Sequence, residues 1–92
     1  MKKIKELNQK YGKFYIYLTN QEIGNDFLKQ VEKEGYTFGD GTKPTQRNYE
    51  DIIAVNPDNT ICYVGFIGRI AYQCNRVIKI DYEKMQYRLK TM

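Results

Sequence analysis

The residues best suited to chemistry lie in one irregular stretch, GDGTKPTQRNYE, at positions 39–50. Its glycines leave the backbone free to point amide groups at an anion, and its arginine is a good bidentate ligand for phosphate. Tyrosines at the flanks could stack on a base. The spacing matches no P-loop, because the four-residue gap and the following helix are missing. The ligand-binding residues predicted here are Tyr36, Gly39, Gly41, Thr42, Lys43, Thr45, Arg47 and Tyr49, and the alternative is a plain surface connection.

A second basic cluster follows later in the chain. Arg69, Arg76 and Lys79 lie in a segment with no acidic residue between Asp58 and Asp81. Arg69 and Arg76 could complete the phosphate site. Alternatively, these charges only keep a sheet edge soluble and unpaired.

Catalytic groups are poorly represented. The chain has no histidine and no serine, which removes the most common general base and the serine nucleophiles. Cys62 has no histidine to activate it, and Cys74 is either a reactive thiol or an incidental cysteine. The carboxylates are too scattered for a metal site. We therefore predict a protein that is not an enzyme and that needs no metal and no cofactor.

The formal charge of +4 is concentrated at the N-terminus. Residues 1–13 hold five lysines and one glutamate, and the remaining chain is neutral. Such a basic arm can bind nucleic acid through phosphate contacts, or it can be a simple solvated face. The chain lacks an apolar run of 18 residues and a signal-peptide core, so we expect a cytoplasmic protein without a membrane partner.

The stretch 19–38 predicts a central amphipathic helix at about 20–34. Thr19 and Glu22 have the spacing of a capping box, and Gly35 follows the last periodic residue. One apolar arc contains Ile23, Gly24, Phe27, Leu28 and Val31. Its glycine is interpreted as allowing close approach of the helix to a sheet.

Strands are predicted around this helix at 13–18, 51–55, 60–64 and 76–82, with a short one at 36–38. The turn Asn56-Pro57-Asp58-Asn59 predicts a hairpin, and 65–75 could be a strand or a helical turn. The fold class is therefore α+β, with a small, mainly antiparallel sheet of three to five strands packed by the central helix. We predict a single domain, with a basic N-terminal helix or arm (1–12), a core (13–82) and a tail (83–92).

The hairpin strands are apolar on both faces, which indicates that both sheet faces are covered. The second face, predicted to carry Tyr15, Tyr17 and Tyr63, would need the N-terminal helix, a partner or a second copy to cover it. These three tyrosines are the predicted interface, and a homo-oligomer is expected. The alternative is that they are ordinary core or rim residues.

The stretches YIYLTNQEIGNDFLKQVEKEGYTFGDGTKPT (15–45) and DIIAVNPDNTICYVG (51–65) carry a resemblance. They resemble small uncharacterised proteins encoded by phages and integrated elements of low-GC Gram-positive bacteria, over about residues 13–82. The resemblance implies an accessory protein that acts without catalysis on host machinery, including immune systems. It names no ligand.

Two functional hypotheses follow. The leading one is a non-enzymatic, oligomeric anti-defence protein that sequesters a small phosphorylated or nucleotide ligand at 36–49, with Arg69 and Arg76 nearby. The alternative is an interaction protein that docks on a host defence protein through the tyrosine face. In that alternative, nucleic acid binding through the lysine arm is less favoured.

Overall fold

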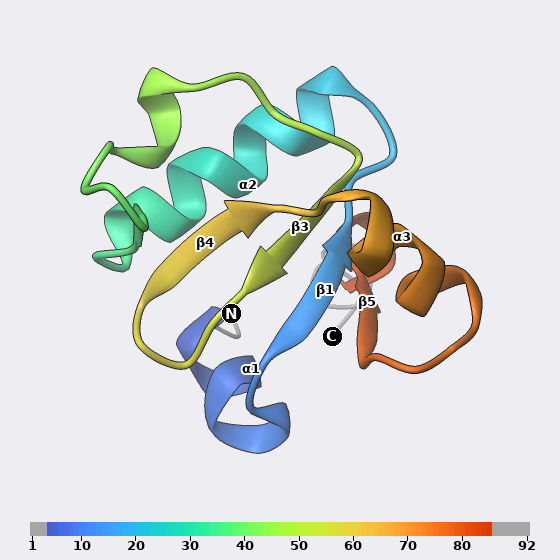
Figure 1. The fold of residues 1–92 in the computed structure, drawn as a ribbon. Coiled ribbons are helices and arrows are strands. Elements are labelled where there is room, and N and C mark those ends of the chain that lie inside the picture. The colour runs from blue at the N-terminus through green and yellow to red at the C-terminus, as the bar shows by residue number, and fades with distance from the viewer. Residues whose placement is uncertain (1–3, 86–92) are drawn as a thin grey trace.

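The computed structural model describes residues 4–85 and shows an α+β fold built on one five-stranded sheet (Figure 1). The strands lie in the order β2-β4-β3-β1-β5. In chain order the elements are α1 (Ile4–Tyr11), β1 (Phe14–Tyr17), α2 (Gln21–Lys33), β2 (Thr37–Phe38), the 3-10 helix η1 (Pro44–Gln46), β3 (Ile52–Val55), β4 (Thr60–Tyr63), α3 (Phe66–Gln73) and β5 (Lys79–Asp81). None of the helices within 4–85 is long and apolar enough to cross a membrane.

The predicted α+β class is confirmed, with a sheet that is mixed. The inner strands β4, β3 and β1 pair antiparallel, and the hairpin at 56–59 joins β3 to β4 as predicted. The edge strands β2 and β5 pair parallel to β4 and β1. Each edge strand follows a helix, α2 or α3, because a parallel strand can be reached only by a crossover connection.

Each face of the sheet has its own apolar cluster. Alternation along β1 sends Phe14 and Ile16 to one face and Tyr15 and Tyr17 to the other. The main core contains Ile4, Leu7, Phe14, Ile16, Leu18, Phe27, Leu28, Val31, Tyr36, Phe38, Ile53, Val55, Ile61 and Tyr82. The second cluster contains Tyr15, Ile52, Ala54 and Val64, with Tyr17, Tyr72 and Val77 packed against it. The second face is thus covered by α3, from the stretch that the sequence left ambiguous between strand and helix.

The N-cap of helix α2 lies one residue later than predicted. The side chain of Asn20, not Thr19, accepts a hydrogen bond from the Ile23 amide at 2.9 Å. The Thr19 hydroxyl instead lies 3.2 Å from the Glu83 carboxylate. The helix ends at Lys33 with Glu34 as its C-cap, and Gly35 follows it as predicted. The φ of Gly35, 92°, is the left-handed conformation that glycine adopts most readily.

Helix α1 is not a separate arm. Ile4 and Leu7 are 1% and 6% exposed and belong to the main core. The Glu34 carboxylate, at the end of α2, accepts hydrogen bonds from the amides of Ile4 and Lys5, each at 2.9 Å. The predicted N-terminal helix is therefore present, and its apolar residues join the core that was predicted at 13–82. Of the predicted tail, 86–92 lie outside the described residues.

Candidate functional site

In the loop at 39–50, which was predicted to bind a ligand, side chains already bind one another. The Asp40 carboxylate accepts a hydrogen bond from the Thr42 amide at 3.0 Å and forms an ion pair with Arg47. Hydrogen bonds from Thr42, with a smaller contribution from Arg47, lower the pKa of Asp40. The guanidinium of Arg47 also lies 4.6 Å from the centre of the Phe38 ring. The charge of Arg47 is therefore already compensated by Asp40, and these contacts hold its side chain.

A second carboxylate holds the middle of this loop. The amide and hydroxyl of Thr45 donate to Glu32 of α2 at 3.0 and 2.7 Å, and these bonds lower the pKa of Glu32. The Gly41 amide donates to the Phe38 carbonyl at 2.9 Å. Gly39 and Lys43 are exposed at the outer side of the loop. A phosphate there would have to displace two carboxylates, so this geometry is unfavourable for an anion.

The flanking tyrosines do not face a common ligand. Tyr36 is 1% exposed and its hydroxyl donates to the side chain of Asn8 in the core. Tyr49 packs on Gly24, where an added Cβ would lie 2.3 Å from ring carbons of Tyr49. The close approach that Gly24 permits is therefore to Tyr49 and not, as predicted, to the sheet.

The remaining predicted residues are not brought to this loop. The loop packs on α2, whereas Arg69 belongs to α3, over the other sheet face, and pairs with Asp51 at 2.7 Å (Figure 1). Arg76 is exposed beyond the end of α3. The structure thus separates the two basic groups that the sequence combined into one site.

The three tyrosines predicted as an interface lie on two different faces. Tyr15 is 9% exposed beneath α3, and Tyr17 is half-buried beside it. Tyr63 packs against Phe38 on the main-core side, and its hydroxyl donates to the Asn48 carbonyl at 2.6 Å. Tyr63 therefore does not share a surface with Tyr15 and Tyr17. Residues two apart on a strand share a face, and Tyr63 has the register of Ile61, which lies in the main core.

The outer side of α3 is the most exposed apolar surface of the described chain. Phe66, Ile67 and Ile70, here called the α3 ridge, are 79%, 81% and 45% exposed. The inner side of α3 is also occupied, since an added Cβ on Gly68 would lie 2.7 Å from Val64. This ridge was not predicted from the sequence. The sequence did contain an indication of the ridge. The eight residues of α3 place apolar side chains around most of the helix, a pattern typical of a helix that is buried on more than one side.

Three cations lie on or beside the apolar cluster that α3 covers. Lys13 and Lys79 lie 5.7 and 4.8 Å from the ring centres of Tyr15 and Tyr72, and Arg76 lies between α3 and β5. Within residues 4–85, none of these three side chains forms a salt bridge. We call Lys13, Arg76 and Lys79 the cationic end.

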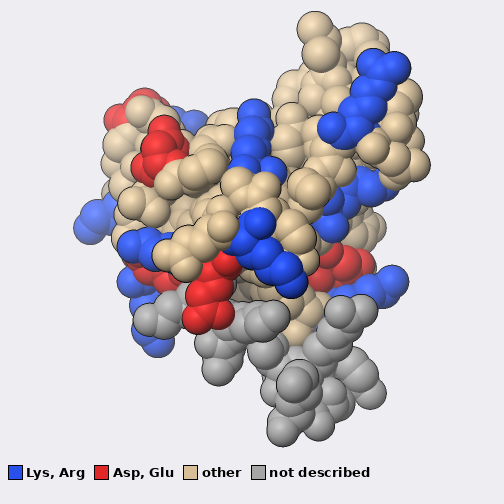
Figure 2. Space-filling model, turned by 90° about the horizontal axis from the view of Figure 1, so that it is seen from below, with Lys and Arg blue, Asp and Glu red and all other residues tan. Residues whose placement is uncertain are grey.

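The described lysines of α1 do not form a continuous basic face. Figure 2, which looks at the molecule from the side of α1, shows lysine and arginine side chains interspersed with acidic ones. A nucleic-acid arm would need adjacent cations along one surface. Lys2 and Lys3 of the predicted arm lie outside the described residues, so this alternative stays a prediction.

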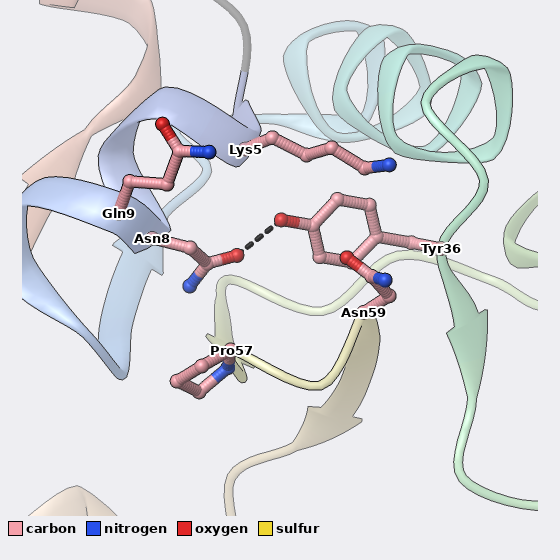
Figure 3. A pocket seen from close by; sticks show the side chains of 6 residues that line it. All are labelled: Lys5, Asn8, Gln9, Tyr36, Pro57 and Asn59. Carbon is pink, nitrogen blue, oxygen red and sulfur yellow. Dashed lines mark hydrogen bonds between the residues drawn. The ribbon is translucent and has the colours of Figure 1, made fainter.

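A pocket of about 180 Å³ lies between α1, the residue before β2 and the turn from β3 to β4 (Figure 3). Lys5 and Gln9 reach over it from α1, and Pro57 and Asn59 border it from the turn. Buried Asn8 and Tyr36 complete its lining. This pocket involves no residue of the predicted site except Tyr36.

Metal-ligating side chains do not cluster within the described chain. No group of three or more histidine, cysteine or acidic residues there could hold a metal ion. Cys62 and Cys74 are both exposed free thiols. The chain matches no protein-family model, and no curated protein and no solved structure is significantly similar to it, so the resemblance to mobile-element proteins stays a prediction.

Proposed function

We propose that this protein is a non-enzymatic binding protein that docks on another protein through the α3 ridge. The observation that supports the proposal is the exposure of Phe66 and Ile67, 79% and 81%, on a helix whose inner side is already packed. Scattered exposed apolar residues are ordinary, but here three lie within two turns of one short helix. Burying each such side chain in a partner contributes about 1.5–3 kcal/mol.

The cationic end indicates the chemistry of the partner. Lys13, Arg76 and Lys79 have no acidic side chain paired with them in the described chain. A groove that is apolar at its centre and bordered by carboxylates would complement both the ridge and these charges.

A second copy fits this surface less well. A two-fold interface through α3 brings the same patch of both copies together. Each copy would contribute its own cationic end, and the interface would gain positive charge without additional acidic residues to pair with it. An anionic membrane surface also fits less well, because Asp51 lies beside α3, paired with Arg69, and would meet the same anionic plane. A protein surface can match both signs of charge.

The biological context of this binding is a separate proposal. We propose an accessory or anti-defence role in a bacterial host, with a host defence protein as the partner. Its support is the sequence resemblance alone. Sequestration of a nucleotide at 36–49 receives no support from the closed geometry of that loop.

Site-specific photo-crosslinking tests the docking surface. A photoreactive amino acid replaces Ile67 in the protein produced in a Gram-positive host, and the matched control carries it at exposed Gln46 of η1. We expect a discrete adduct with a different protein from position 67 alone, and its loss when Phe66→Ser is added.

Two outcomes would overturn the proposal. An adduct with twice the mass of the chain would assign the ridge to self-association. Equal cross-linking from positions 67 and 46, or none from position 67, would show that α3 is not a docking surface.

A further inference from the structure

We propose that the pocket between α1 and the turn from β3 to β4 binds the oxyanion group of a small ligand, a carboxylate or a phosphate. The pocket is distinct from the α3 ridge and from the closed loop at 39–50. Its six lining residues are Lys5, Asn8, Gln9, Tyr36, Pro57 and Asn59.

The floor of the pocket is rigid and polar. Asn8 and Tyr36 are 8% and 1% exposed. The Asn8 amide nitrogen donates to the carbonyls of Gly12 at 3.0 Å and Val55 at 3.3 Å, and its oxygen accepts from the Tyr36 hydroxyl (Figure 3). These bonds connect α1, β3 and the residue before β2, so the floor is fixed before any ligand arrives. Such preorganisation lowers the entropy cost of binding.

The rim of the pocket supplies donors that have no partner among the described residues. Within residues 4–85, the side chains of Lys5, Gln9 and Asn59 form no hydrogen bond, although all three line the pocket. An ammonium group carries three donors and each carboxamide carries two. Each of the three can donate a charge-assisted hydrogen bond to an oxyanion that enters the pocket.

Lys5 supplies the positive charge that a negative ligand would meet. No acidic side chain lines the pocket, and Lys5 is its one charged lining residue. Besides burial, the nearby Glu34 carboxylate contributes to the raised pKa of Tyr36, but it already accepts hydrogen bonds from the first backbone amides of α1. The turn residue Asp58 accepts from the amide and hydroxyl of Thr60 at 3.2 and 2.6 Å and so is held against the hairpin.

The size of the pocket limits the ligand. Its volume of about 180 Å³ is below the roughly 300–1,000 Å³ of pockets for drug-sized molecules. It therefore suits one functional group with a few attached atoms. Carboxylate and phosphate share the required chemistry, and they can be distinguished only by measurement.

Nuclear magnetic resonance titration of the full chain with inorganic phosphate, and separately with acetate, tests this site. We expect saturable shifts of the backbone amides of residues 5, 9 and 59, with Kd in about the millimolar range for such small probes. The stronger probe identifies the ligand class. Acetamide, which is neutral, serves as the control and should cause no saturable shift.

Two variants make the test specific. Lys5→Ala removes the charge, and Asn59→Gly removes the carboxamide while keeping the backbone, because φ of Asn59 is 67° and glycine adopts this conformation freely. We expect each to weaken binding about tenfold. Lys10→Ala, on the same helix but outside the pocket lining, should change nothing.

Unsaturable shifts spread over all lysines, or equal binding by Lys5→Ala and Lys10→Ala, would overturn the proposal. Ile67→Glu alters the α3 ridge and leaves this pocket intact, so it should bind phosphate like the original protein. Failure of the docking proposal and failure of this one can therefore be distinguished.

Discussion

Gly24 and Tyr49 illustrate how one contact can decide a substitution. Alanine at a mid-helix glycine normally stabilises a helix by about 1 kcal/mol. Here the new Cβ would lie 2.3 Å from ring carbons of Tyr49, so the ring must leave its place. We expect Gly24→Ala to lower the free energy of unfolding by about 1–3 kcal/mol, measured by urea unfolding followed by circular dichroism.

A double-mutant cycle gives the control for this prediction. In a Tyr49→Ala background the obstructing ring is absent, so Gly24→Ala should regain its helix propensity and stabilise the protein. If Gly24→Ala had the same effect in both backgrounds, the contact with Tyr49 would not be its cause.

At the scale of elements, α1 is a structural part of the core and not an appendage. Leu7 is 6% exposed among main-core residues, and Glu34 caps the start of the helix. We expect Leu7→Ala to lower the free energy of unfolding by about 2–5 kcal/mol in urea unfolding. Exposed Lys10→Ala, on the same helix, should stay within about 0.5 kcal/mol. A Leu7→Ala effect as small as that of Lys10→Ala would restore the idea of a dispensable arm.

At the scale of the whole molecule, two buried tyrosines make the protein sensitive to alkali. Burial, with a smaller contribution from Glu34, raises the pKa of Tyr36 to about 12. Burial and the hydrogen bond to Asp26 raise the pKa of Tyr82 as well. Unfolded tyrosines titrate near 10, so from about pH 10 to 12 the unfolded state releases protons that the folded state keeps. Stability is therefore present below pH 10 and falls as the pH rises.

Urea unfolding at steps between pH 9 and 12 measures this loss. Tyr36→Phe removes one of the two groups, so we expect a lower stability at pH 9 but a shallower decline above pH 10. An unchanged slope in that variant would show that Tyr36 does not cause the decline.

Features that depend on neighbouring residues could be predicted from the sequence, whereas contacts between distant residues could not. The period of α2, the glycine that ends it and the hairpin at 56–59 are local patterns, and the structure confirms them. The cap differed by one residue because Thr19 and Asn20 are both good caps. Helix α3 was ambiguous because a short apolar run fits a strand or a helix equally well.

The candidate site was predicted less well because its contacts join residues that are far apart in the sequence. The basic and glycine residues of 39–50 are visible in the sequence, but Glu32 comes 13 residues before the Thr45 that it binds. Composition cannot show that a carboxylate from α2 closes the loop. The pocket likewise combines Lys5, Tyr36 and Asn59, which only the folded chain brings together.

The order of the strands has a consequence for synthesis. Strand β1 pairs with β3 and β5, both encoded later, and Tyr82 packs edge-on against Phe27 at 5.5 Å. A ribosome adds roughly 5–20 residues per second, so β1 emerges seconds before its last partner and meanwhile exposes unpaired hydrogen-bonding groups. The nascent chain therefore completes its core only when residue 82 leaves the ribosome, and chains stopped before that point become substrates for chaperones and proteases.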